Sequence, residues 1–182
     1  MYMEALRMQF RPLKADELEV RVGSVSKQGV TLLLYKNARV DMAVLDETVG
    51  AENWQRDHKE IKGNLYCGIG IKCGNEWVWK WDCGTESNTE KEKGEASDSF
   101  KRAAVNWGIG RELYSCPKIR VKCATKNRVD GDDSKGFVQV NKFEFYGAYV
   151  SDIDYFKDPE SGVYTINNVT VKDQNGKVIF NG

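Results

Sequence analysis

Two adjacent cations in the middle of a predicted amphipathic helix are the residues with the clearest chemical potential. Lys101 and Arg102 lie within residues 89–114, where apolar residues recur at helical spacing. These apolar residues are Ala96, Phe100, Ala103, Ala104 and Trp107. Because residues three and four apart share one side of a helix, both cations must point away from the buried side. Cations presented in this way are suited to binding a polyanion.

The positive charge continues beyond that helix. Residues 101–128 hold eight basic residues against a single acid, Glu112. They are Lys101, Arg102, Arg111, Lys118, Arg120, Lys122, Lys126 and Arg128. The whole chain has 27 basic and 27 acidic residues, and residues 41–98 hold thirteen acids against seven bases. This segregation is typical of a surface for a polyanion, although a merely solvated charged face explains it more simply.

A further candidate cation, Arg39, stands near the start of an earlier predicted helix. Residues 38–49 carry apolar side chains at spacings of four, three and four, at Ala38, Met42, Leu45 and Val49. Gly50 supplies the stop. A cation at a helix start gains nothing from the macrodipole, so either an external anion or a snorkelling surface arginine accounts for it.

Other site chemistry has little support. The single histidine, His58, lies in a polar stretch and is interpreted as an exposed strand residue rather than half of a catalytic pair. The five cysteines include no C-x-x-C pair and are interpreted as reduced structural thiols rather than zinc ligands. The sequence has no phosphate-binding loop, dinucleotide fingerprint or H-E-x-x-H motif. We therefore expect a binding protein without a cofactor or metal rather than an enzyme.

The elements that position these residues predict an α+β fold. Strands over residues 54–61, 64–73 and 76–83 are separated by the turns Lys62-Gly63 and Gly74-Asn75, which predicts an antiparallel β-meander packed by amphipathic helices. A capping box predicts that the long helix begins within residues 87–90, and Gly108 ends it. Residues 1–22 are predicted as short helical pieces, with a helical turn or two over 15–20, and residues 30–35 as a strand.

Three tryptophans share one face of the third meander strand. Trp77, Trp79 and Trp81 alternate at period two, opposite Val78, Lys80 and Asp82. They could stack bases, as the sheet platforms of single-strand binders do. The favoured interpretation is that they cover the helices, because each ring buries a large area and the helices need a matching apolar surface.

The C-terminal part is rich in predicted strands. Residues 119–123 alternate, with Arg120 and Lys122 on a basic face, and residues 124–136 resemble an exposed linker. Strands follow over 137–154, 164–172 and 177–180. At 182 residues the chain fits one compact domain, and it has no bilayer-spanning apolar run or signal peptide, so we expect a cytoplasmic protein without membrane contact.

The order of these motifs resembles the Rad52/Rad22 family of single-strand annealing proteins. The likeness rests on residues 35–40, 45–47, 49–54, 66–84 and 98–104 with Trp107-Gly108, and covers approximately residues 8–123. The phage Sak-type branch is most similar. The Lys-Arg helix with its flanking glycine is the most specific part of the resemblance.

The resemblance implies a β-β-β-α core that assembles into a ring or helical filament and binds single-stranded DNA in a basic groove. It implies that Lys101 and Arg102 contact the DNA backbone, joined by Arg39, and that Lys72 matches a hairpin lysine of a second DNA site. Where the family often has another basic residue, this chain has Val105, for which Arg111 is a candidate substitute. Arg120 and Lys122 complete the expected DNA-binding set.

We therefore expect ATP-independent annealing in homologous recombination and DNA repair by a phage or prophage protein. Residues 1–128 would form the annealing core and residues 129–182 an acidic, β-rich extension packed on the same domain. A phage exonuclease or a host single-strand binding protein is an expected partner. Two alternatives remain: a monomeric module for single-stranded DNA or RNA without annealing activity, and a metal-dependent nuclease on the same scaffold.

Overall fold

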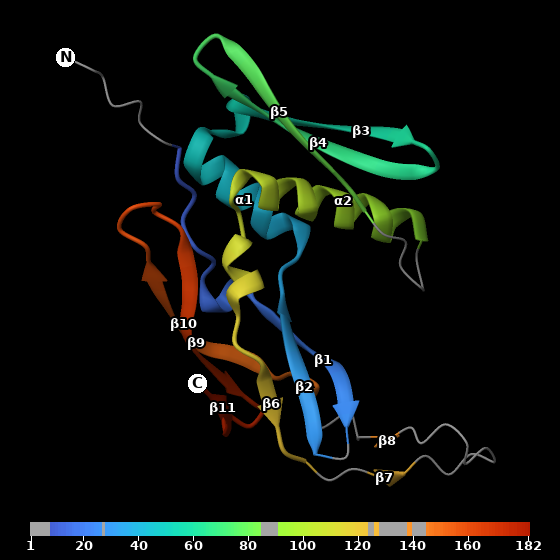
Figure 1. The fold of residues 1–182 in the computed structure, drawn as a ribbon, viewed down its shortest axis with the longest axis vertical. Helices are drawn as coiled ribbons and strands as arrows, with labels where there is room; N and C mark the ends of the chain where they lie inside the picture. Colours follow the sequence, from blue (N-terminus) through green and yellow to red (C-terminus); the bar gives the residue numbers. More distant parts are fainter. Residues whose placement is uncertain (1–7, 27, 85–90, 124–125, 128–137, 140–144) are drawn as a thin grey trace. The chain divides into compact units, whose positions relative to one another are not determined.

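The computed structural model describes residues 8–26, 28–84, 91–123, 126–127, 138–139 and 145–182. It confirms the α+β class, with helices packed on antiparallel sheets and a strand-rich C-terminal part (Figure 1). The chain divides into two compact units. Unit 1 comprises Met1–Leu13 and Asn37–Arg111, and unit 2 comprises Lys14–Lys36 and Glu112–Gly182.

Unit 1 contains the predicted meander and both α-helices. Its order is α1 (Ala38–Val49), η2 (Ala51–Asn53), β3 (Trp54–Ile61), β4 (Asn64–Cys73), β5 (Glu76–Cys83) and α2 (Lys91–Trp107). The strands pair antiparallel in the order β3-β4-β5, with the predicted bounds. Lys62 and Gly63 both have positive φ, as a tight two-residue hairpin turn requires. The helices lie on one face of this sheet (Figure 1).

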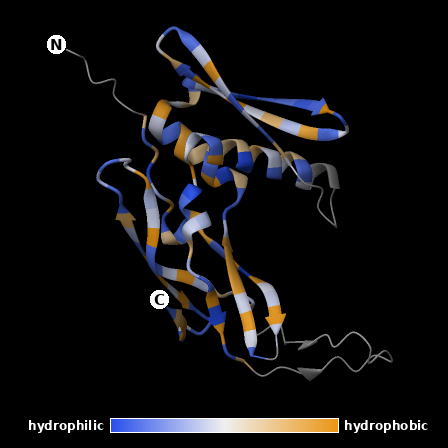
Figure 2. Ribbon diagram, viewed as in Figure 1, coloured by the Kyte–Doolittle hydropathy of each residue, from blue (hydrophilic) through white to orange (hydrophobic). Residues whose placement is uncertain are grey.

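The core of unit 1 lies between that face and the helices. The alternation of β4 is confirmed, since Cys67, Ile69 and Ile71 are fully buried. They contact apolar residues of both helices: Val44, Leu45, Phe100, Ala103 and Ala104. Figure 2 shows the alternation of hydrophobic and hydrophilic residues along the meander strands. Burying this apolar area holds α2 in a fixed orientation on the sheet.

The helix ends follow local rules. Asn37 caps α1, its side chain accepting a hydrogen bond from the Arg39 backbone N–H at 2.9 Å. Gly50 ends α1 with φ of 84°. The predicted start of α2 within residues 87–90 lies outside the described residues. The other end of α2 is at Trp107, and Gly108 follows with φ of 106°.

Unit 2 is built on a six-stranded antiparallel sheet of order β11-β10-β9-β1-β2-β6. Its strands are β1 (Glu19–Ser26), β2 (Gly29–Tyr35), β6 (Ile119–Val121), β9 (Tyr149–Lys157), β10 (Tyr164–Lys172) and β11 (Val178–Asn181). The remaining short elements are η1 (Ala15–Glu17), η3 (Arg111–Ser115), β7 (Lys126–Asn127) and β8 (Val138–Gln139). None of the described helices is long and apolar enough to cross a bilayer.

The helical prediction for residues 15–20 is wrong beyond its first turn. Only η1 is helical, and β1 begins at Glu19 because it pairs with β2 along its length and with β9 at Tyr149. Strands from both sides of residue 128 thus share one sheet. That residues 1–128 form the annealing core and residues 129–182 an extension stays a prediction.

Candidate nucleic-acid interface

The tryptophans of β5 do not cover the helices. Trp81 pairs with Gly68, Trp79 with Gly70 and Trp77 with Lys72. Paired residues of antiparallel strands share a face, so all three rings lie on the face of the sheet away from α2. Trp77 is 40% exposed, and Trp79 and Trp81 are half-buried. The core interpretation of these tryptophans is therefore wrong.

The glycines of β4 explain where the rings lie instead. A Cβ added at Gly68 would stand 2.5 Å from the ring of Trp81, and one added at Gly70 would stand 2.7 Å from that of Trp79. The indoles therefore rest directly on the β4 backbone. The sequence could have predicted the face on which the tryptophans lie. A two-residue turn after Cys73 pairs Lys72 with Trp77, and this register puts the tryptophans on the same face as the glycines of β4.

On the opposite face, polar residues of β5 hold the C-terminal half of α2. Lys80 Nζ donates to the Asn106 carbonyl at 2.9 Å and lies 4.3 Å from the centroid of the Trp107 ring. Burial lowers the pKa of Lys80, and the nearby positive charge of Arg111 lowers it further. These contacts place a cation where the helix dipole is negative.

Asp82 is the second of these polar residues, and it pairs with a predicted DNA-binding residue. It accepts hydrogen bonds from Arg102 Nε at 3.2 Å, from Asn106 Nδ2 at 3.3 Å and from the Cys83 backbone N–H at 2.8 Å. The Arg102 side chain is 44% exposed and that of Asp82 is 26% exposed. Arg102 is thus directed toward β5 yet accessible to solvent.

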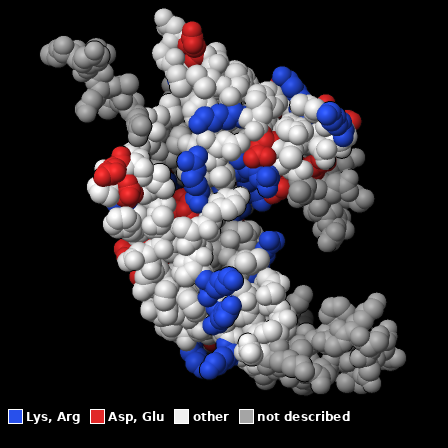
Figure 3. All heavy atoms as spheres, in the orientation of Figure 1, with Lys and Arg blue, Asp and Glu red and all other residues white. Residues whose placement is uncertain are grey.

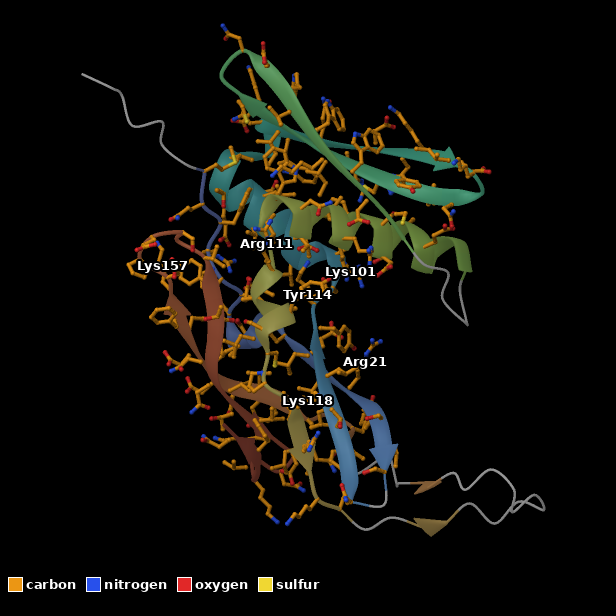
Figure 4. The ribbon with its side chains drawn as sticks, viewed as in Figure 1. Arg21, Lys101, Arg111, Tyr114, Lys118 and Lys157 are labelled. Carbon is orange, nitrogen blue, oxygen red and sulfur yellow. The ribbon has the colours of Figure 1, made fainter. Side chains whose placement is uncertain are left out.

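Lys101 occupies a different side of α2. Successive residues are about 100° apart around a helix, so Lys101 and Arg102 diverge. Lys101 is half-buried, and Figure 4 shows it on the side of α2 away from the sheet. Within the described part of the chain, no hydrogen bond or ion pair engages its ammonium group. The pair therefore presents two cations along separate lines of the helix surface.

Arg111 stabilises the end of α2. Its Nη2 donates to the carbonyls of Val105 at 3.0 Å and Asn106 at 3.3 Å, and its Nε donates to Val105 at 3.3 Å. These carbonyls belong to the last turn of the helix, which lacks intrahelical partners. Periodicity cannot reveal such a contact, because it depends on how the chain turns after Gly108.

The remaining predicted site residues are exposed. Arg39 lies in the first turn of α1, and Lys72 lies beside Trp77 on the tryptophan face. Arg120 of β6 and Lys122 just after it belong to unit 2. Figure 3 shows Lys and Arg side chains on the visible face of both units. Unit 1 places Lys101 and Arg102 on different sides of α2 and Arg111 at the end of that helix.

The other candidate groups have ordinary surroundings. His58 is exposed on β3, which confirms its interpretation as a surface strand residue. Cys67, Cys73, Cys83, Cys116 and Cys123 are free thiols. Burial raises the pKa of Cys67 to about 11, as expected for a structural thiol. Among the residues that the structure describes, no group of His, Cys, Asp and Glu is arranged to hold a metal ion.

Fold and site together define an α+β protein whose antiparallel meander supports a cation-bearing helix. The family model described as Rad52/22 family double-strand break repair protein matches residues 4–130, and the chain belongs to this family. Comparison with curated proteins gave no significant match, and neither did comparison with solved structures. Family membership assigns the chain to DNA repair and recombination, with single-stranded DNA binding, strand annealing and oligomerisation.

Proposed function

We propose that this protein anneals complementary DNA strands without ATP and that it belongs to the phage Sak-type branch of its family. The observation that carries the proposal is the Lys101-Arg102 pair on a helix held rigidly by the sheet. Such cations bind phosphates and leave base edges free to find a complement. Arg39, on a helix that packs against α2, adds a third cation to the same unit.

The ion pair between Arg102 and Asp82 is compatible with this role. Exposed ion pairs contribute only about 0.2–1 kcal/mol, because water screens both charges. A phosphate oxygen can therefore replace the Asp82 carboxylate at little cost. In the free protein, Asp82 keeps the guanidinium oriented beside α2.

The other predicted cations are proposed as additional phosphate contacts. Arg111 uses Nε and Nη2 for the helix end, and its Nη1 is available for a phosphate. Lys72, Arg120 and Lys122 are exposed and offer separate phosphate contacts, Lys72 on the tryptophan face of unit 1 and the other two in unit 2. Because a few contacts per subunit bind weakly, we propose a ring or helical filament in which many subunits bind one strand.

We further propose that residues 1–128 carry the annealing contacts and residues 129–182 form an extension. The protein acts in the cytoplasm, beside a phage exonuclease or a host single-strand binding protein. It is not an enzyme in this proposal, since holding and pairing strands requires no bond cleavage. The absence of a phosphate-binding loop motif from the sequence supports activity without nucleotide hydrolysis.

The experiment is annealing of two complementary oligonucleotides without nucleotide or metal, combined with sedimentation of the protein with and without one strand. We expect faster duplex formation and an oligomer much larger than the 20.7 kDa chain. A monomer that binds single strands but does not speed annealing would instead favour the simple binding module. Metal-dependent shortening of the labelled strand would favour the nuclease.

A further inference from the structure

The three β5 tryptophans, Trp77, Trp79 and Trp81, lie on one face of the meander and are here called the tryptophan shelf. The rings of Trp79 and Trp81 stack with centroids 5.7 Å apart and planes 23° from parallel. Both of these rings rest on glycine backbone, whereas Trp77 pairs with Lys72. It lies on the face of the sheet opposite α2, away from the proposed cation helix.

The indole N–H groups distinguish the shelf from the other tryptophans of unit 1. Trp54 donates its indole N–H to Asp46 at 2.6 Å, and Trp107 donates to the Ile69 carbonyl at 2.9 Å. No described residue accepts a hydrogen bond from an indole of the shelf. Buried tryptophans ordinarily satisfy this donor, so the shelf indoles are suited to an external acceptor.

Cations lie at both ends of the shelf. Lys59 Nζ stands 4.4 Å from the centroid of the Trp81 ring and 3.6 Å from the Asp57 carboxylate. Lys72 is exposed beside Trp77 at the other end. Flat aromatic rings combined with neighbouring cations are what single-stranded nucleic acids require, because bases stack on the rings while phosphates contact the cations.

The spacing of the shelf also fits an extended strand. Side chains on one face of a β-strand repeat about every 6.6 Å, about twice the 3.4 Å rise per nucleotide of one duplex strand. Successive bases of a stretched single strand could therefore each meet one ring. Stacking of this kind tolerates any sequence, since every base has a π face.

We propose that the tryptophan shelf is a second contact for single-stranded DNA, one that stacks bases rather than binding phosphates. It rests on the proposed function only in requiring that the protein bind single strands. A neighbouring copy of this chain is the competing occupant. Lysines are depleted at the cores of protein interfaces, so Lys59 and Lys72 favour DNA over a second copy.

The test compares binding of an oligo-dT strand and an abasic strand of equal length by fluorescence anisotropy. We expect the unsubstituted protein to bind oligo-dT at least about tenfold more tightly, the effect of one or more stacked bases. Trp77→Ala should weaken oligo-dT binding by about tenfold and leave binding of the abasic strand unchanged. Trp79→Leu should have the same effect. If Trp79→Leu misfolds, Trp77→Ala still tests the proposal, because Trp77 is 40% exposed and its replacement should leave the fold intact.

The matched control is Val78→Ala, on the same strand with the same 40% exposure but on the α2 face. It should leave the preference for oligo-dT unchanged. Equal losses on both strands, or no loss on either, would overturn the shelf proposal. So would a loss of oligomer in the tryptophan variants with an unchanged base preference, which would assign the shelf to a subunit contact. Failure of the unsubstituted protein to bind either strand would instead reject the proposed function.

Discussion

Asp82→Asn should strengthen binding of single-stranded DNA. In the free protein, the Asp82 carboxylate holds Arg102 Nε at 3.2 Å. DNA must displace this carboxylate, and with side-chain exposures of 44% and 26% the pair contributes about 0.2–1 kcal/mol. Removing the competing charge should therefore raise the affinity by up to about fivefold per subunit.

The fold should tolerate this substitution. The asparagine carbonyl can still accept the Cys83 N–H that Asp82 now accepts at 2.8 Å. The hydrogen bond that Asn106 Nδ2 donates to the other oxygen, at 3.3 Å, is lost because an amide NH2 replaces that oxygen, and we expect a loss of about 1 kcal/mol in the free energy of unfolding. Denaturant unfolding measures this loss independently of DNA binding.

The assay is a double-mutant cycle in which the affinity for oligo-dT is measured at several salt concentrations. Asp82→Asn is combined with Arg102→Ala, and the two effects should not add, because Asp82 acts on DNA through Arg102. Glu47→Gln is the matched control, since it changes the charge equally and releases Arg11 from a 2.6 Å ion pair in the same unit. An equal gain in the Arg102→Ala background, or an equal gain from Glu47→Gln, would refute the reasoning.

Three further predictions concern unit 1. Arg111→Lys keeps the charge but loses the planar guanidinium that donates to the Val105 and Asn106 carbonyls. The free energy of thermal unfolding should therefore fall by about 1 kcal/mol, while the salt dependence of DNA binding stays constant. A lowered salt dependence would contradict this prediction. The folded-state pKa of Cys67, about 11, lies above the 9.0 of a free thiol. The stability that this pKa difference contributes is therefore present below pH 9 and lost as pH rises from about 9 to about 11, by roughly 3 kcal/mol. Cys67→Ala should flatten this part of the curve of unfolding free energy against pH, and an unflattened curve would exclude the thiol as its source. Gly70→Ala should displace the Trp79 ring and cost about 1–3 kcal/mol in denaturant unfolding, and an unchanged midpoint would show that the ring does not rest on this backbone.

Unit 1 could be predicted closely because its signals are local. Turn residues at Lys62-Gly63 and Gly74-Asn75, with the alternation of β4, define both hairpins. The face of the tryptophans also follows from these turns, but only when the register is carried across the hairpin. The large area that a tryptophan ring buries favoured the face that packs on the helices, which is wrong. The missing side chains of Gly68 and Gly70 leave space for the rings on the other face.

The contacts around the candidate site could not be predicted, because they join residues distant in the chain. Asp82 meets Arg102 across twenty residues, and Lys80 meets Asn106 across twenty-six. No periodicity relates these positions. β1 is a different case, because Val20 and Val22 alternate with Glu19 and Arg21, so its residues already indicate the strand that pairing with β2 and β9 completes.

The most direct test of the account is the salt dependence of single-strand binding by the Lys101→Ala, Arg102→Ala double variant. Each phosphate contact contributes about 0.7 to the slope of log affinity against log salt. We expect the slope to fall by about 1.4 per subunit engaged, with weaker binding, slower annealing and an unchanged circular dichroism spectrum. A well-folded double variant that keeps the original slope and annealing rate would contradict the claim that these two cations bind the DNA backbone.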